Sequence, residues 1–210
     1  MTDDAQEQTR AAEVIALPSN RFASRMAAAA GFLALQRGEP EGVLWLYEEY
    51  GRFVHKTVHR LLGADDAHDD IVQEVFISLM RRARSLQNQD SVPSFVRRVA
   101  VSRVIDELRR RGVRRRLFAF SEDQDRFEGT QANPETRDLL RRVFVLLERL
   151  KAKDRVAFQL RYVERYSLAE VASACDCSVA TATRRIRHAR ERLRVFAAAD
   201  PELARLVEAL

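Results

Sequence analysis

The chain has 210 residues, enough for one or two domains, and its hydrophobic content of 46% is ordinary for a globular protein. Its 36 Lys and Arg residues exceed its 31 Asp and Glu residues by a net charge of +5, which is too small to establish a nucleic-acid partner. The apolar run over residues 27–35 is far shorter than the ~20 residues that span a bilayer. We therefore expect a cytoplasmic protein without membrane insertion.

Residues 1–13 are polar and acidic, and we expect residues 1–18 to form a disordered extension. From Ser19 onward the apolar spacing is helical almost throughout, with no convincing run of strand alternation, so the sequence predicts an all-α fold. The first helix ends at Gly38-Glu39-Pro40. Its apolar run should pack on the domain that follows.

Three more helices are predicted in the first half of the chain. Apolar positions indicate a second helix, or a broken pair of helices, over 44–62, and a third from 65 or 66 to about 84. Ser91 can cap a fourth helix that would end naturally at Gly112.

The third predicted helix has polar residues outside its apolar face, where packing in a core does not explain them. A helix dipole favours carboxylates in the first turn, by about 0.3–1 kcal/mol each. This explains Asp69 and Asp70 well, but Gln73 and Glu74 less well. A catalytic carboxylate pair is conceivable, but no nucleophile, metal-ligand spacing or glycine-rich phosphate loop accompanies it. We therefore expect no enzyme activity, no metal ligand and no cofactor.

The fourth predicted helix has a basic ridge along its outer side. The ridge consists of Arg97, Arg98, Arg103, Arg109, Arg110 and Arg111, continued by Arg114, Arg115 and Arg116. Such a ridge can neutralise nucleic-acid phosphates. Basic residues near a helix C-terminus also suit the helix dipole, so part of the cluster can be structural.

The helical spacing is lost over residues 117–133, which we interpret as a flexible linker. Asn133-Pro134 then provides a cap followed by proline at the first helical position, a strong helix start. The sequence thus predicts two small helical domains, at 19–116 and 134–196, followed by a tail at 197–210 that forms a short helix from Pro201.

The most informative segment lies near the C-terminus and predicts a helix-turn-helix. Ser167 and Glu170 fit a capping box for its first helix, and Ser178 can cap the second. The second helix has an apolar stripe of Val179, Ala182, Ile186, Ala189 and Leu193. Such a helix enters the major groove of DNA. The alternative is an amphipathic helix whose arginines are simply solvated.

Cys175 and Cys177 lie in the turn of this motif. Two thiols are too few for a zinc site of four protein ligands, and a disulfide across one residue would be strained. We expect small, reduced side chains here, and the sequence leaves open whether they respond to redox changes.

Three sequence blocks, taken together, resemble the extracytoplasmic-function (ECF) sigma factors of bacterial RNA polymerase. They are residues 46–63, residues 69–76 with 103–110, and residues 160–193, in an order and spacing that cover about 37–196. Met80 and Phe95 stand where many members have Trp, and Val101-Ser102 replaces a commoner Arg-Asn. These departures concern the part of the family that meets the −10 element.

The resemblance implies three sets of binding residues. Core polymerase would be bound by Asp69, Asp70, Gln73, Glu74 and Ser78. The −10 element would be bound by Asn88, Arg97, Arg98, Ser102, Arg103, Asp106, Arg109 and Arg110. The −35 element would be bound by Ser178, Thr181, Thr183, Arg184, Arg185, Arg187 and His188.

The same resemblance implies the partners and activity of the chain. Bacterial core RNA polymerase and promoter DNA would be partners, and many members are also held inactive by an anti-sigma factor, although no residue here identifies one. The implied activity is promoter selection and help with strand opening. A stand-alone helix-turn-helix regulator is the alternative, and an RNA-binding or structural helical protein is a third.

Overall fold

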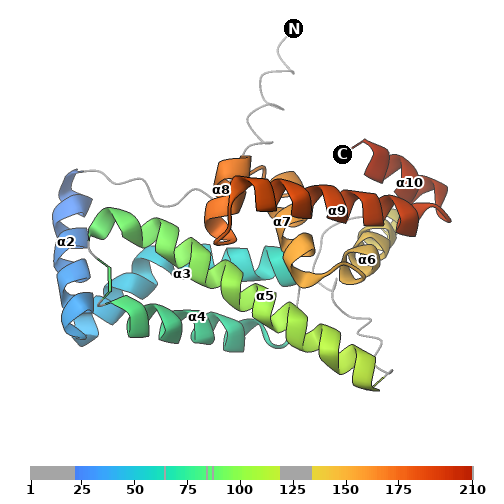
Figure 1. The fold of residues 1–210 in the computed structure, drawn as a ribbon. Coiled ribbons are helices and arrows are strands. Elements are labelled where there is room, and N and C mark those ends of the chain that lie inside the picture. Colours follow the sequence, from blue (N-terminus) through green and yellow to red (C-terminus); the bar gives the residue numbers. More distant parts are fainter. Residues whose placement is uncertain (1–21, 64, 84, 87, 119–133, 210) are drawn as a thin grey trace, which may run out of the picture.

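The computed structural model of the chain describes residues 22–118, except 64, 84 and 87, and residues 134–209. Every regular element within these ranges is a helix (Figure 1). The all-α prediction is therefore confirmed. The expected disorder of 1–18 and nearly all of the expected linker lie outside the described residues. No described helix has the length and apolar character that crossing a bilayer requires.

The first half of the chain is a helical bundle. It comprises α2 (Phe22–Arg37), α3 (Pro40–Leu62), α4 (His68–Ala83), a short 3₁₀ turn η1 (Gln89–Ser91) and the long α5 (Val92–Phe118). Figure 1 shows α2 at one end of the bundle, across the ends of the other helices. The prediction left open a broken pair before residue 62, and the structure has one continuous helix there.

The core of this bundle consists of the apolar stripes of α3, α4 and α5. Its most completely buried side chains include Leu46, Val54, Val58, Leu61, Val75, Leu79, Val96 and Val101. Each buried Val or Leu contributes roughly 1.5–3 kcal/mol relative to its exposed state. Helix α2 packs directly against the start of α3. A Cβ atom at Gly42 of α3 would collide with the backbone of Leu35 of α2.

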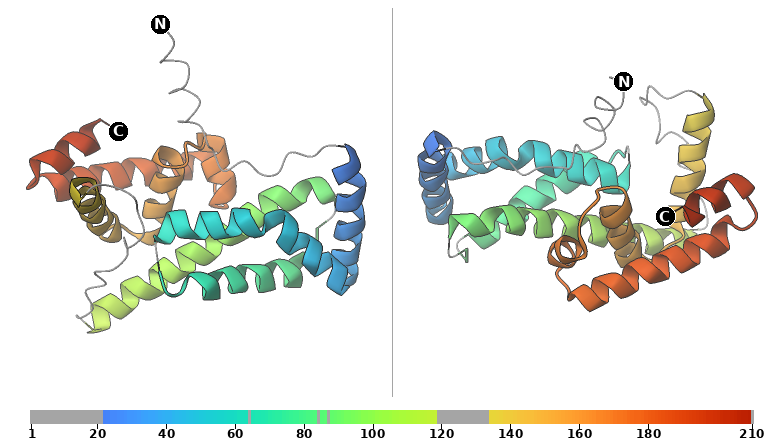
Figure 2. Two further views of the ribbon diagram at one scale, coloured as in Figure 1. Left: turned by 180° about the vertical axis from the view of Figure 1, so that it is seen from behind. Right: turned by 90° about the horizontal axis from the view of Figure 1, so that it is seen from above.

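The second half of the chain is built around one long helix. It comprises α6 (Pro134–Glu148), α7 (Ala152–Tyr162), α8 (Leu168–Ala174), α9 (Val179–Ala197) and α10 (Pro201–Glu208). The other four helices all contact α9. Figure 2 shows α9 extending along this half of the molecule, with α6 and α10 near its C-terminal end.

The C-terminal tail is part of this fold. Asp200 caps α10 by accepting hydrogen bonds from the backbone N–H groups of Glu202 and Leu203. Arg142 of α6 pairs with Asp200 at 2.6 Å and with Glu202 at 2.5 Å. These N–H donors and the Arg142 guanidinium lower the pKa of the Asp200 carboxyl. The predicted short helix of the tail is confirmed, and it is anchored to α6.

Two glycines show where a helix does and does not end. Gly63 has a φ of 90° and ends α3, as predicted. Gly112 does not end α5, which continues to Phe118. No atom lies near the position of a Cβ at Gly112, and an interior glycine costs a helix only about 1 kcal/mol.

The two halves of the chain are joined where α7 meets the end of α3. The guanidinium of Arg155 donates a hydrogen bond to the carbonyl of Leu61 at 3.1 Å, and the amide of Gln159 donates to the same carbonyl at 3.4 Å. The last carbonyls of a helix have no partner within it, and a positive charge there suits the helix dipole. Helix α7 thus caps α3 from the other half of the chain.

An ion pair lies beside this cap. Arg60 donates to Glu164 at 2.8 Å, and the Glu164 side chain is only 2% exposed. Farther along, the Arg97 guanidinium lies 5.2 Å from the centre of the Tyr166 ring, and Arg98 pairs with Asp176 at 3.7 Å. The contacts between the halves thus combine these polar groups with a buried apolar cluster that continues from α3 and α5 into α7 and α8.

We predict that Arg60→Ala loosens the contact between the two halves. It would leave the buried Glu164 carboxylate without its cation, a penalty on the order of 1–3 kcal/mol. Small-angle scattering should then show a larger radius of gyration than for the parent chain. Arg37→Ala, which removes only an exposed pair with Glu39, should leave the radius unchanged. An unchanged radius for Arg60→Ala would show that the pair does not hold the halves together.

Candidate nucleic-acid interface

The helix-turn-helix is held in shape by local hydrogen bonds that the sequence predicts. The Ser167 hydroxyl accepts from the Glu170 backbone N–H at 3.2 Å, while the Glu170 carboxylate accepts from the Ser167 N–H at 2.8 Å. This capping box lowers the pKa of Glu170. Ser178 caps α9 in the predicted way. Asp176 adopts a φ of 48° in the turn, a conformation that Asp tolerates better than most residues.

The predicted apolar stripe of α9 is confirmed except at its first residue. Ala182, Ile186, Ala189 and Leu193 are buried, whereas Val179 is 47% exposed. Val179 is the first residue of the helix. Side chains lean toward the N-terminus of their helix, so the Val179 side chain projects toward the turn and beyond the core.

The polar residues expected to read the −35 element all lie on or just before α9. Arg184 and Arg187 are exposed. Arg185 donates to Cys177 Sγ at 3.5 Å, and His188 Nδ1 lies 2.7 Å from a carboxylate oxygen of Asp154. The other three predicted residues, Ser178, Thr181 and Thr183, make hydrogen bonds within the start of α9. Arg184 and Arg187 are thus the most outwardly directed of the set.

The basic side of α9 faces a cleft of about 770 Å³ between α9, the start of α7 and the C-terminal end of α5. The cleft is lined by basic side chains from all three, namely Arg109, Arg111, Lys153, Arg155, Arg184, Arg185, Arg187 and His188. A reading helix must enter a major groove about 12 Å wide, flanked by the rest of the duplex. This cleft has no room for a duplex, so the end of α5 restricts access to α9 here.

The residues expected at the −10 element are divided between two environments. Arg97 and Arg98 turn toward Tyr166 and Asp176 of the other half. Ser102, Arg109 and Arg110 are exposed, and Asp106 pairs with Arg103 and Arg109 at 3.9 and 3.4 Å. Asn88 is exposed, but its carboxamide oxygen accepts from the Ser91 N–H at 2.9 Å. A base contact from Asn88 would therefore come from its NH₂ group.

The residues expected to bind core polymerase lie along one side of α4. Asp69, Asp70 and Gln73 are exposed. Glu74 pairs with Arg110 of α5 at 3.1 Å, and the Ser78 hydroxyl donates to the Glu74 backbone carbonyl at 2.7 Å. A residue expected to bind polymerase thus contacts one expected to bind DNA, so the two surfaces meet at Glu74.

Sequence reasoning missed the residues that join the two halves. Arg60, Arg155, Gln159 and Glu164 are polar groups whose partners lie 94 to 104 residues away. The available signal was local, since Arg155 and Gln159 are four residues apart and so lie on one face of α7. Nothing in the sequence identifies the carbonyls that they meet.

The structure describes both cysteines as free thiols. Burial, with a smaller contribution from Cys177, raises the pKa of Cys175 to about 12. Because the thiolate is the reactive form, Cys175 is unsuited to rapid redox chemistry.

The family models of Sigma-70 match both halves of the chain. Region 2 matches residues 46–114, and region 4 matches residues 140–193. Together the two matches cover more than half of the sequence, in the order found in one protein family. The chain belongs to the ECF sigma factors.

Curated relatives of this sigma factor support the assignment. The ECF RNA polymerase sigma-E factor of Escherichia coli K12 is 29% identical over 171 residues, which cover 75% of this chain and 87% of that protein. The ECF sigma factor SigE of Mycolicibacterium smegmatis is 28% identical over 157 residues, and the match spans 60% of its length.

Solved structures show the same fold. CnrH in complex with the cytosolic domain of CnrY matches 83% of this chain and 99% of its own, with a TM-score of 0.52. RpoE in complex with the anti-sigma factor NepR from Bartonella quintana matches 71% and 92%, with a TM-score of 0.50. Both are 19% identical to this sigma factor.

We predict that Ser167→Ala lowers the free energy of unfolding by about 1 kcal/mol, because it removes the cap of α8. Chemical denaturation followed by circular dichroism measures this change. Ser173→Ala, an exposed change inside the same helix, is the matched control and should be nearly neutral. Equal effects of both variants would contradict a capping role for Ser167.

We predict that Cys175 resists alkylation in the native chain at pH 8, because its pKa of about 12 keeps it protonated. Mass spectrometry after brief iodoacetamide treatment should find Cys175 unmodified in the folded protein and fully modified after denaturation. Fast modification of native Cys175 would refute this protected state.

Proposed function

We propose that this sigma factor binds bacterial core RNA polymerase, directs it to promoters through their −10 and −35 elements, and assists strand opening without catalysis of its own. The observation that carries the proposal is the match to Sigma-70 regions 2 and 4 in one chain, with a helix-turn-helix in the second. It would act in the cytoplasm, where core polymerase is found.

We assign core binding to one side of α4. Asp69, Asp70 and Gln73 present exposed acidic and amide groups on successive turns of one rigid helix. The apolar stripe of α4 is fixed in the bundle core, so these groups are held in a constant arrangement. An acidic, preorganised face suits a basic or amide-rich partner surface through electrostatic complementarity.

We assign the −35 element to α9 and the −10 element to α5 with η1. The exposed Arg184 and Arg187 can reach base edges or phosphates once α9 enters a major groove. The exposed Arg109 and Arg110 of α5, joined by Arg97 and Arg98 once the halves separate, would hold the backbone of the opened strand. A base taken out of the stack needs a pocket whose contacts offset an unstacking cost of a few kcal/mol, and the turn around Asn88 would supply it.

Promoter binding requires the two halves to move apart. Sites about 25 base pairs apart are separated by about 85 Å along straight duplex. The whole of α5, with 27 residues, is only about 40 Å long. The described arrangement packs α8 directly on α5. We therefore propose that it is a closed state, which opens when polymerase and DNA compete for the same polar groups.

An anti-sigma factor is a further candidate partner. The solved structures of CnrH and RpoE each contain a second protein, CnrY or the anti-sigma factor NepR. By that likeness we propose that a regulatory protein can hold this chain inactive.

The test is run-off transcription with purified core polymerase on a library of genomic promoter fragments. We expect defined start sites with the chain and core together, and none with core alone. The absence of any selected start site would refute the sigma-factor function. Tight duplex binding by the chain alone, with no effect of core, would instead favour the stand-alone regulator.

Two substitutions should separate the assigned surfaces. Glu74→Lys should weaken capture of core polymerase at least about tenfold, since it reverses the charge of a docking residue. Arg184→Ala should leave core capture intact but reduce selection of the −35 sequence, because each good base contact contributes about 1–3 kcal/mol. Arg194→Ala, an exposed change in the last turn of α9, is the matched control. Loss of core capture by Arg184→Ala would contradict this division.

A further inference from the structure

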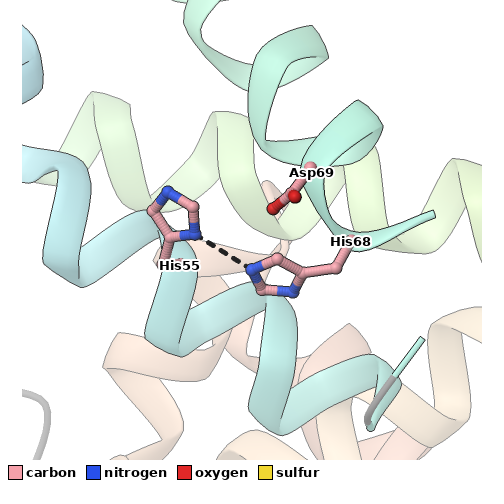
Figure 3. Close-up of side chains that lie close together, drawn as sticks. All are labelled: His55, His68 and Asp69. Carbon is pink, nitrogen blue, oxygen red and sulfur yellow. Dashed lines mark hydrogen bonds between the residues drawn. The ribbon is translucent and has the colours of Figure 1, made fainter. Parts of the chain in front are cut away.

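Three of the four histidines of the chain gather on the first bundle, away from the residues assigned to DNA. His55 and His59 lie one turn apart on α3, and His68 begins α4. Figure 3 shows the His55 and His68 rings facing one another, with the Asp69 carboxylate directed toward the space beside them. None of these histidines has a part in the proposed function.

The two imidazole nitrogens are close to the separation that a metal ion requires. His55 Nδ1 lies 3.0 Å from His68 Nε2. The available atoms of His55, His68 and Asp69 all lie within 4.8 Å of one another. Two nitrogens bound to a tetrahedral zinc ion, each at about 2.0–2.1 Å, are about 3.3 Å apart. A metal ion could therefore replace the hydrogen bond if the two rings move apart by a few tenths of an ångström.

The backbone that carries these ligands is held in place. Asp65 accepts a hydrogen bond from the Ala67 N–H at 2.9 Å and is also bound by Arg111 of α5 at 2.7 Å. These contacts fix the residues just before α4 against α5, and hence the start of the helix that carries His68 and Asp69. A metal site benefits from such preorganisation, because less order has to be created on binding.

We propose that His55, His68 and Asp69 form a binding site for a divalent transition-metal ion such as Zn²⁺. Two imidazoles with one carboxylate suit zinc, nickel or copper better than magnesium or calcium, which prefer an all-oxygen shell. The fourth position falls to water or to His59, whose ring centre lies 6.2 Å from that of His68. Arg52, Lys56 and the Asp69 carboxylate border the same pocket.

The sequence predicted no metal ligand, because these residues are divided between two helices and show no metal-ligand spacing. The fold brings His55 and His68 together although 13 positions separate them. Asp69 is also among the residues assigned to core binding. We therefore test metal binding on the free chain, without polymerase. A failure to bind metal there would leave the proposed sigma-factor function untouched, and a failure of that function would leave the metal site untouched.

The experiment is calorimetric titration of the tag-free, metal-free full chain with Zn²⁺ and, separately, with Mg²⁺. We expect one zinc ion per chain, a zinc-dependent rise in Tm and no comparable Mg²⁺ binding. His68→Gln and Asp69→Asn should each weaken zinc binding at least about tenfold. Thermal unfolding without metal establishes that each variant is folded, and Asp69→Asn preserves the shape of an exposed side chain.

Two control variants identify competing sites. His188→Gln removes the remaining histidine, and Cys175→Ser with Cys177→Ser removes both thiols; zinc affinity should survive in each. The Co²⁺-loaded parent should show no thiolate charge-transfer absorption. Zinc affinity unchanged in folded His68→Gln, or lost with the two cysteines, would overturn the proposal.

Discussion

The end of α3 is the constraint on which the arrangement of the chain depends. Its last carbonyls would lack partners within the helix, and α7 supplies them with the Arg155 guanidinium and the Gln159 amide. Both side chains are almost fully buried by this contact. Because one half completes a helix of the other, and one buried apolar cluster spans both, the two halves are held in one defined orientation. The Arg60–Glu164 pair beside the cap strengthens that orientation.

This closed packing has a direct consequence for nucleic-acid binding. Arg97 and Arg98 contact the second half, and the basic side of α9 faces the end of α5. The same arginines would be needed for phosphate contacts, so closure and DNA binding use one set of donors. These polar contacts can be exchanged for contacts with DNA phosphates, whereas separating the halves would also expose part of the apolar cluster that spans them. In the proposed mechanism, the second half of the chain and promoter DNA thus compete for the same arginines.

The sequence predicted features that depend on local chemistry. Apolar spacing located the helices, and Ser167, Glu170 and Ser178 were identified as caps because caps depend on residues within one turn. Features set by distant contacts were not predictable. Three local features were also not foreseen: helix α5 passes through Gly112, Val179 is exposed, and Asn88 uses its oxygen for a turn. The histidine cluster and the cap of α3 arise only when separate helices meet.

The most direct measurement is the distance between the two halves before and after assembly with polymerase. Fluorophores on Ser94→Cys of α5 and Ser173→Cys of α8, in a chain with Cys175→Ser and Cys177→Ser, would report it by energy transfer. Both serines are exposed and lie on helices that contact one another. The account predicts high transfer in the free chain and low transfer in the promoter-bound holoenzyme. High transfer maintained in a complex that initiates transcription would contradict it.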